Sequence, residues 1–193
     1  MAALLLTWGL PMFSSSRHDR GFTVVEMLMV VAMIAVLAVI GLPVMKDMTE
    51  NIKLNQAARL VEREMQDARL KAVSSNRLIR VRMNCPFTGY IRSVEVLGTA
   101  ADNATNRCST TAYPFPPPDD DIMTRPNFDG PVRVLPLDAT VSNVVVQFSP
   151  DGSAASVING VPTTLAAPLS VMISRHGKSK TATVNNVGKV QLE

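Results

Sequence analysis

The chain has 193 residues, about the length of one domain, and its formal net charge of +3 is too small to indicate nucleic-acid binding by itself. Its hydrophobicity is concentrated near the N-terminus, where residues 27–45 contain no charged or strongly polar side chain. A helix over this run, rising about 1.5 Å per residue, nearly matches the ~30 Å core of a bilayer. The composition therefore predicts one membrane-spanning segment followed by a domain large enough for one hydrophobic core.

The charges that flank this run predict its orientation. Arg17 and Arg20 precede it, and the next basic residue is Lys46, which Asp47 and Glu50 offset. Since cytoplasmic flanks carry the excess of Lys and Arg, the N-terminus is expected in the cytoplasm and the remainder across the membrane. In a bacterium this describes a single-pass inner-membrane protein with a periplasmic C-terminal domain.

A single carboxylate, Glu26, stands almost at the start of the apolar run. An ionised carboxylate costs roughly 3 kcal/mol or more in hydrocarbon, so such a residue is by default functional and has a partner. A secretory signal peptide would need a small-residue cleavage site, which "GLPVMKDM" does not supply. A plain single-pass anchor explains the length of the run but leaves Glu26 unexplained.

The stretch "RGFTVVE", followed by about twenty apolar residues, resembles the type IV prepilin signature of bacterial pilins and pseudopilins. The resemblance implies that a prepilin peptidase cuts between Gly21 and Phe22 and methylates the new amine of Phe22. It also implies that Glu26 pairs with this amine on a neighbouring subunit during assembly, and that Pro43 is the helix-kinking proline of many pilins. Residues 1–21 would then be a removed leader; translation from Met12 is favoured, with a genuinely longer leader as the alternative.

The next part of the chain is predicted to be an amphipathic helix over residues 46–77, continuous with the membrane helix. Its apolar side chains recur at steps of three and four, a stripe that faces a core: Leu54, Ala57, Ala58, Val61, Met65, Ala68 and Ala72. Strands are expected over residues 78–83, 90–97, 132–137, 143–149, 169–174, 181–185 and 189–192, with turns at "SPDG", "NGVP", "RHGK" and "NNVG". One long helix followed by several short strands predicts an α+β fold with antiparallel sheet.

Residues 98–131 are expected to be irregular, because the proline-rich "YPFPPPDDD" over 113–121 cannot form a central strand. The three aspartates in this stretch are interpreted as a solvated acidic loop, with a calcium site as the less favoured alternative, since the ligand spacing of a known calcium loop is missing. Cys85 and Cys108 lie in no metal or redox motif. In a periplasmic domain a single structural disulfide is the simplest interpretation, and two free thiols are the alternative.

Three stretches of the C-terminal part resemble the soluble domain of the GspH/FimT family, the H-type minor pseudopilins of type II secretion and the FimT/FimU-type minor pilins. They are "DARLKAVSSNRLIRVRM", "VVVQFSPDGSA" and "ISRHGKSKTATVNNVGKVQLE". The family often has a helix-borne Ala-Arg pair, an "F-x-P-x-G" turn, here Phe148, Pro150 and Gly152, and a closing Gly-basic strand. The resemblance implies a pilin fold with four parts: the leader 1–21, an assembly helix 22–45, an amphipathic helix 46–77 and a β-rich domain 78–193.

An enzyme is not predicted, and no cofactor or metal is expected. His18 lies in the leader, and His176 lies beside Gly177 in an expected turn, away from any legible Ser–His–acid arrangement. The leading hypothesis is a minor pseudopilin that initiates or caps a periplasmic pseudopilus for type II secretion. Its implied partners are prepilin peptidase, other pilins or pseudopilins through the N-terminal helix, and the inner-membrane assembly platform.

The alternative function is that of a minor pilin of a type IV pilus, with a role in DNA uptake. Its candidate phosphate contacts are Arg175, Lys178, Lys180 and Lys189, although a solvated hairpin face explains them more simply. DNA-binding members of the resembled family carry a C-terminal Gly-Arg-x-Arg pattern. Here "GKVQ" at 188–191 keeps one basic residue and loses the other, which weakens this hypothesis. A membrane-tethered binding module outside any filament is a third option, against which Glu26 argues.

Overall fold

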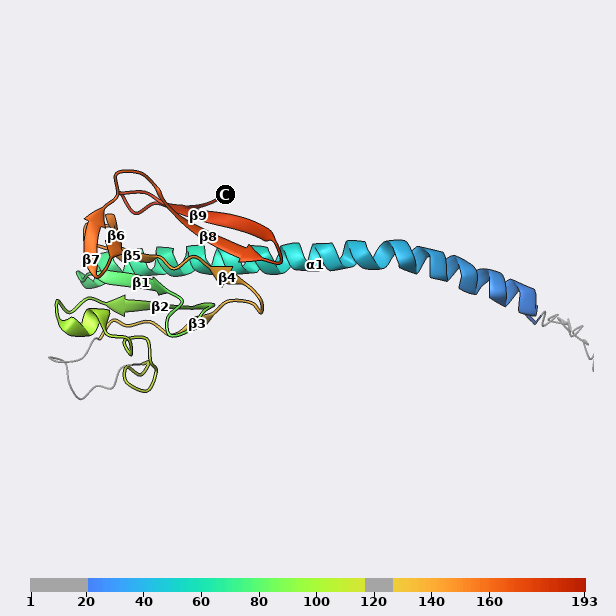
Figure 1. Cartoon of the computed structure of the whole chain (residues 1–193), viewed down its shortest axis with the longest axis horizontal. Helices are drawn as coiled ribbons and strands as arrows, with labels where there is room; N and C mark the ends of the chain where they lie inside the picture. The colour runs from blue at the N-terminus through green and yellow to red at the C-terminus, as the bar shows by residue number, and fades with distance from the viewer. Residues whose placement is uncertain (1–20, 117–126) are drawn as a thin grey trace, which may run out of the picture. The chain divides into compact units, whose positions relative to one another are not determined.

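The structure, a computed structural model, describes residues 21–116 and 127–193 (Figure 1). The leader up to Arg20, with the alternative start at Met12 and His18, lies outside the described residues, as do the aspartates at 119–121 of the expected acidic loop. The described chain divides after Val44 into two units. The α+β class predicted from the sequence is confirmed, because in the described ranges one long helix is followed by ten strands, all paired antiparallel.

Helix α1 (Val24–Ser75) contains both the apolar run and the amphipathic segment. It ends at Ser75, two residues before the end predicted at residue 77, and the reason is a left-handed cap: Asn76 has a φ of 53°. The N–H of Arg77 donates to the carbonyl of Ala72 at 3.2 Å, the backbone bond that defines a Schellman motif. The cap satisfies a terminal carbonyl and turns the chain toward its first strand.

The second unit, Met45–Glu193, holds the hydrophobic core between the C-terminal part of α1 and two sheets (Figure 1). The predicted stripe of α1 is confirmed, since all seven of its side chains are at most 4% exposed. It has one member that the apolar pattern could not reveal, Glu64, which is 6% exposed and pairs with Arg133. The small side chains at Ala57, Ala58 and Ala68 fit among the larger apolar residues of the sheets.

Sheet A has the order β3-β2-β1-β5-β6-β7 and sheet B the order β10-β9-β8-β4. The strands of sheet A are β1 (Ile79–Met83), β2 (Tyr90–Glu95), β3 (Arg133–Val134), β5 (Val145–Phe148), β6 (Ala154–Ile158) and β7 (Val161–Thr164). Those of sheet B are β4 (Thr140–Val141), β8 (Leu169–Arg175), β9 (Lys178–Val184) and β10 (Val190–Leu192). The loop after β2 holds a short 3-10 helix, η1 (Ala100–Asn103).

The structure corrects the strand predictions in two places. The strand expected over 132–137 shrinks to the two residues of β3, because Pro131 and Pro136 flank it and cannot donate ladder hydrogen bonds.

Strands β4, β6 and β7 were not predicted. The expected turn "NGVP" consists only of Asn159 and Gly160, both with positive φ, so β6 and β7 form a two-residue hairpin.

Strand β1 decides which side chains face outward. Ile79, Val81 and Met83 are at most 2% exposed and face the core. Because side chains alternate along a strand, Arg80 and Arg82 project from the opposite face of sheet A. Arg82 lies opposite Arg92 of β2 on one side and Val145 of β5 on the other.

Candidate functional site

The apolar helix begins with a cap that gives Glu26 a local role. The hydroxyl of Thr23 accepts the N–H of Glu26 at 3.2 Å, and the carbonyl of Thr23 accepts the N–H of Met27 at 3.2 Å. The spacing Thr-x-x-Glu is that of a capping box, and a first-turn carboxylate also suits the positive end of the helix dipole. The sequence contained this signal in "TVVE", and the prepilin interpretation of Glu26 did not use it.

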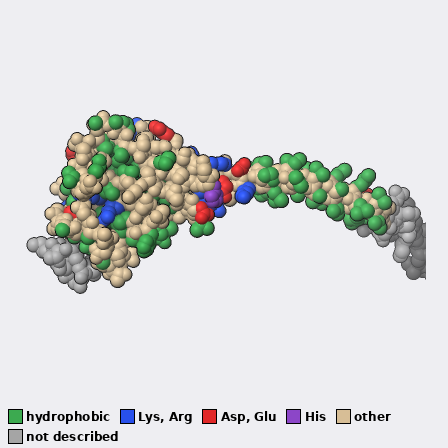
Figure 2. All heavy atoms as spheres, in the orientation of Figure 1, with side chains coloured by type: hydrophobic (Ala, Val, Ile, Leu, Met, Phe, Trp, Pro, Cys, Tyr) green, Lys and Arg blue, Asp and Glu red, His purple; other side chains and the backbone are tan. Residues whose placement is uncertain are grey.

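Among the described residues, the side chains of the apolar run are not buried against any other part of the chain. Every residue from Gly21 to Thr49 is exposed, with Phe22 at 72% and Leu37 at 70%. Figure 2 shows that apolar side chains cover the part of the helix formed by the apolar run. Among the described residues α1 is the one helix long and apolar enough to cross a membrane. An uninterrupted apolar surface of this extent marks a segment that a bilayer or other helices must cover.

Pro43 lies inside α1, where its ring nitrogen cannot donate a backbone hydrogen bond. Gly41 stands two residues before it, and nothing lies within 4 Å of the position that a side chain there would take. Both residues weaken the helix locally, because proline removes a bond and glycine is a poor helix former. The expected kink-prone position therefore has a physical basis, although its role in assembly stays a prediction.

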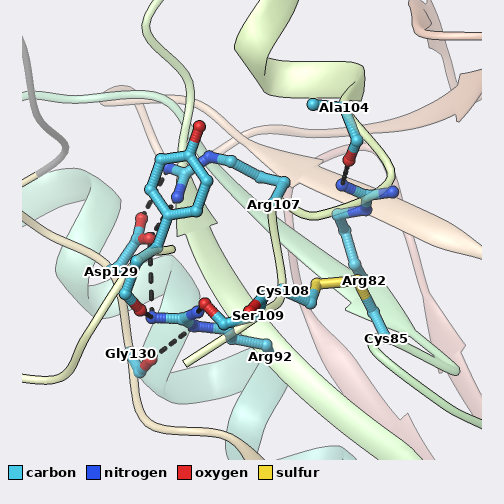
Figure 3. Close-up of a disulfide and its surroundings, with 10 residues drawn as sticks. Arg82, Cys85, Arg92, Ala104, Arg107, Cys108, Ser109, Asp129 and Gly130 are labelled. Atoms are coloured by element: carbon cyan, nitrogen blue, oxygen red, sulfur yellow. Dashed lines mark hydrogen bonds and ion pairs between the residues drawn. A yellow bond between two sulfur atoms is a disulfide. The ribbon is translucent and has the colours of Figure 1, made fainter. Parts of the chain in front are cut away.

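The two cysteines of the second unit form a disulfide. Cys85 and Cys108 are joined with a Cα–Cα distance of 5.5 Å across a sequence separation of 23 (Figure 3). Cys85 follows β1, whereas Cys108 lies in the irregular segment after η1. The bond therefore ties that segment to the outer side of sheet A.

A buried charge cluster reinforces the same attachment. Arg92 and Arg107 are fully buried, and both guanidinium groups point to the carboxylate of Asp129, which is 2% exposed (Figure 3). Arg107 binds Asp129 through both terminal nitrogens, while an Arg92 nitrogen lies 3.7 Å from it. The ring of Tyr113 covers Arg107, with its centroid 4.4 Å from the guanidinium carbon.

The arginines of this cluster also satisfy backbone carbonyls of the irregular segment. Arg92 donates to the carbonyls of Gly130 at 3.0 Å and Tyr113 at 2.7 Å in this segment, and Arg107 donates to the carbonyl of Glu95, the last residue of β2, at 3.0 Å. Buried carbonyls without a partner are costly, so these bonds allow the described part of this segment, which contains no strand before residue 133, to pack on the sheet. Burial lowers the pKa of Arg92, and Arg107 lowers it further, while Asp129 opposes both effects. No sequence motif pointed to this cluster.

Arg69 explains two of the motifs that carry the GspH/FimT resemblance. It follows Ala68 on α1, donates from Nε to the carbonyl of Gly152 at 3.0 Å, and donates from a terminal nitrogen to the carbonyl of Val187 at 3.0 Å. One guanidinium thus joins the helix to the turn at 149–152 and the turn at 185–188. Gly188 has a φ of 71°, and a Cβ there would collide with the carbonyl of Gly152. These motif residues therefore have a structural role, because they hold the two turns against α1.

The candidate DNA contacts do not form one surface, and for Arg175 the prediction was wrong. Arg175 is 4% exposed, pairs with Glu50 of α1 and donates to the carbonyl of Leu137 at 2.9 Å. Its charge is neutralised inside the fold, so it is not available to a phosphate. A basic residue at a hairpin end gives no sequence sign that a helix residue 125 positions earlier will cover it.

The three lysines are dispersed along the hairpins of sheet B. Lys178 donates to Asn51 at 3.0 Å and lies 3.6 Å from Asp47. Lys189 is exposed and follows the far end of β9, so roughly 20 Å of strand separates it from Lys178. Lys180 lies between these ends on the same face as Lys178. His176 is a turn residue with a φ of 47°, and its Nδ1 lies 2.8 Å from Glu50.

Among the described residues no three His, Cys, Asp or Glu side chains cluster in a way that could hold a metal ion. The suggested calcium ligands at 119–121 lie outside that part of the chain. What the described residues do present is an exposed apolar helix with one acidic residue in its first turn, attached to a domain fixed by a disulfide and ion pairs.

Comparison with protein families identifies the class of the N-terminal segment. Residues 16–42 match the model of the prokaryotic N-terminal methylation motif. The prepilin-type signature recognised in the sequence is confirmed at the level of this motif, which includes Gly21, Phe22 and Glu26. A search of curated proteins found no match.

Solved structures similar to this chain include two minor subunits. One is the type IV minor pilin FimU of Pseudomonas aeruginosa strain PAO1, with 18% identity and a TM-score of 0.46 over 76% of this chain and 92% of that chain. Another is the minor pseudopilin EpsH from the Type 2 Secretion System of Vibrio cholerae, with 13% identity and a TM-score of 0.42 over 73% of this chain and 96% of that chain.

Proposed function

We propose that the chain is a non-enzymatic minor pseudopilin, which initiates or caps a periplasmic pseudopilus of type II secretion. The observation that carries the proposal is the methylation motif at residues 16–42, from which an uncovered apolar helix follows. The helix would hold the subunit in the inner membrane before assembly and pack among other pseudopilin helices afterwards. Prepilin peptidase would cut after Gly21 on the cytoplasmic side, and the domain from Met45 onward would lie in the periplasm.

Within this function Glu26 is the docking group. Its carboxylate makes no ion pair within the described chain, and it stands in the first turn of an otherwise apolar segment. Cleavage before Phe22 would create an amine near the membrane. A carboxylate and an amine from neighbouring subunits stabilise each other in a low dielectric only when both are satisfied. Assembly would therefore offset the free-energy cost of an unpaired Glu26 carboxylate in the membrane.

The alternative is a minor pilin of a type IV pilus with a role in DNA uptake. The observation in its favour is the exposed Lys189, which follows Gly188 at the position of the resembled basic pattern. Against it, Arg175 is buried and Lys178 is engaged by α1. Phosphate binding needs several accessible cations on one surface, so these positions argue against the DNA-uptake role.

The docking role is tested by Glu26→Ala. Inserting the monomer should be at least as favourable as in the wild type, because a costly charge is removed. Incorporation should weaken, since a buried amine is left without its partner at a cost of roughly 3–5 kcal/mol, about two to three and a half orders of magnitude in affinity. The measurements are the amount of subunit in the inner membrane and its crosslinking to partner pseudopilins.

Glu62→Ala is the matched control, because Glu62 is also a helix carboxylate but lies beyond the apolar run and contacts Gln66. Lost crosslinks for Glu26→Ala alone, at normal membrane levels, would support the proposal. Undiminished crosslinks would show that Glu26 is not a docking group and would favour a plain membrane tether.

A deletion strain separates the two filament systems. Loss of exoprotein secretion, with pili and DNA uptake intact, is expected for a pseudopilin. Loss of pili or of transformation with normal secretion would instead establish the alternative. Restoration by the wild-type gene, and not by Glu26→Ala, would connect the phenotype to assembly.

A further inference from the structure

The outer face of sheet A contains a groove that the filament hypothesis does not use. Its volume is about 580 Å³, within the range of pockets that bind ligands of several hundred daltons. Arg80 and Arg82 of β1 contribute its two basic side chains and Asp102 its one acidic side chain, whereas Val145, Val157 and Leu169 contribute apolar walls. The groove lies on the side of β1 that faces away from α1 and the core.

The two arginines of the groove differ in the number of hydrogen bonds that their guanidinium groups donate. Arg80 is fixed by three hydrogen bonds, to Gln147 at 2.7 Å, to Asn103 at 3.1 Å and to the carbonyl of Gly160 at 3.3 Å. Arg82 is partly buried and donates one hydrogen bond, to the carbonyl of Ala104 at 3.3 Å. Among the described residues Arg82 has no carboxylate within ion-pair distance.

The acidic residue of the groove, Asp102, and the buried Asp129 are both engaged by other groups. Asp129 is bound by Arg107 and Arg92, and Asp102 accepts the backbone N–H groups of Leu97, Gly98 and Thr99. Burial lowers the pKa of Arg82, and repulsion from Arg107 and Arg80 lowers it further. Arg82 is therefore a partly buried guanidinium that donates one hydrogen bond and has no acidic partner in the described chain, at the wall of a groove.

We propose that this groove binds an extended acidic segment of a partner protein. A carboxylate of that segment forms an ion pair with Arg82, and its aliphatic neighbours lie against Val145 and Val157. Carboxylates suit the planar fork of arginine, which can bind them with two parallel hydrogen bonds. Charge complementarity selects the acidic group, and the apolar walls select a peptide in preference to a bare anion. The inference is independent of the proposed filament function, because neither Phe22 nor Glu26 takes part.

Strand addition at the nearby edge of sheet A is not the mode of binding. β7 is the exposed edge strand, but Pro162 lies within it and has no N–H to donate to a further strand. Pro162 pairs with Val157, next to the hydrogen-bonded pair Ile158–Val161 that closes the hairpin, so its missing donor is on the free edge. The groove, and not the edge, is the surface fitted to a partner.

The test uses the full chain in nanodiscs of neutral lipid and a fluorescein-labelled peptide with the sequence VDVDV. Saturable binding by fluorescence anisotropy is expected, and Arg82→Gln should weaken it by about tenfold or more, because a charge-assisted bond is lost. Arg82→Lys should recover part of the affinity. Arg63→Gln is the control, since Arg63 is an exposed surface arginine with an i,i+4 partner.

Two further arms identify the source of the anion. The peptide VNVNV should bind at least about tenfold more weakly than VDVDV, because it lacks the charge. Inorganic phosphate in equal concentration should not displace VDVDV; equal competition would mean a site for small anions and would overturn the peptide proposal. Val157→Trp, which fills the groove and leaves Arg82 in place, should also abolish binding. Equal affinity of Arg82→Gln, Val157→Trp and the wild type would refute the site.

Discussion

Replacing Asp129 with asparagine tests the physical account of the cluster that holds the irregular segment. The variant keeps the size of the side chain and one hydrogen-bond acceptor, but it removes the negative charge between Arg92 and Arg107. Both arginines are 0% exposed, so neither can turn to water without opening the structure. Removing one partner of a buried ion pair costs roughly 3–5 kcal/mol, and the retained acceptor places Asp129→Asn at about 3 kcal/mol.

That loss is large for a domain whose total stability is about 5–15 kcal/mol. For a domain of this size, 1 kcal/mol shifts the Tm by roughly 2–4 °C, so a decrease of about 6–12 °C is expected. The assay is thermal unfolding of the full chain in detergent, followed by circular dichroism of the strands.

The control for this experiment is Asp67→Asn. Asp67 pairs with Arg63 on the surface of α1, where the two side chains are 56% and 81% exposed. Exposed pairs of this kind contribute about 0–1 kcal/mol, so the Tm should change by no more than a few degrees. Similar shifts for both variants would refute the reasoning, because they would mean that burial of the arginines does not determine the cost.

Three other predictions concern processing, redox state and pH. Intact-mass analysis of the membrane-extracted protein should find a chain that begins at Phe22 with one added methyl group; a mature chain that retains Gly21 would exclude prepilin processing. Alkylation without reductant should label neither Cys85 nor Cys108, and reduction should lower stability by about 3 kcal/mol in the chain-entropy model. Burial raises the pKa of Glu64 against the opposing effect of Arg133, so the folded state holds this proton more tightly than the unfolded chain. The free energy of unfolding should therefore fall as pH rises above the ordinary glutamate pKa of about 4.3. Urea unfolding at several pH values should show a smaller fall for Glu64→Gln than for the wild type. An identical dependence on pH in both proteins would contradict the assignment.

The local elements of the fold could be predicted because each depends on near neighbours in the sequence. The stripe from Leu54 to Ala72 follows from helical periodicity, and the end of α1 follows from the polar residues near Asn76. The strands β4, β6 and β7 were missed because they depend on partners that are distant in the sequence or on their place in the sheet. β4 has two residues and exists only through pairing with β8, while β7 contains a proline that is acceptable only at a sheet edge.

The candidate site divides in the same way. The methylation motif and the cap at Thr23 are both contiguous patterns in the sequence, although only the first was recognised there. The roles of Arg175, Arg82 and Arg107 were not accessible in this way, because their side chains look alike in the sequence. One is neutralised by a helix residue, one faces a groove, and one is buried against an aspartate.

The sequence by itself determined the apolar helix, its processing motif, the position of Glu26 and the α+β class. Each of these depends on composition or on spacing of a few residues, which local physics converts directly into structure. The tertiary structure alone decided which charges are compensated. The energy of a charged group depends on the distance and burial of its partners, and folding brings those partners together from positions tens of residues apart, as it does for Glu50 with Arg175 and Asp129 with Arg107.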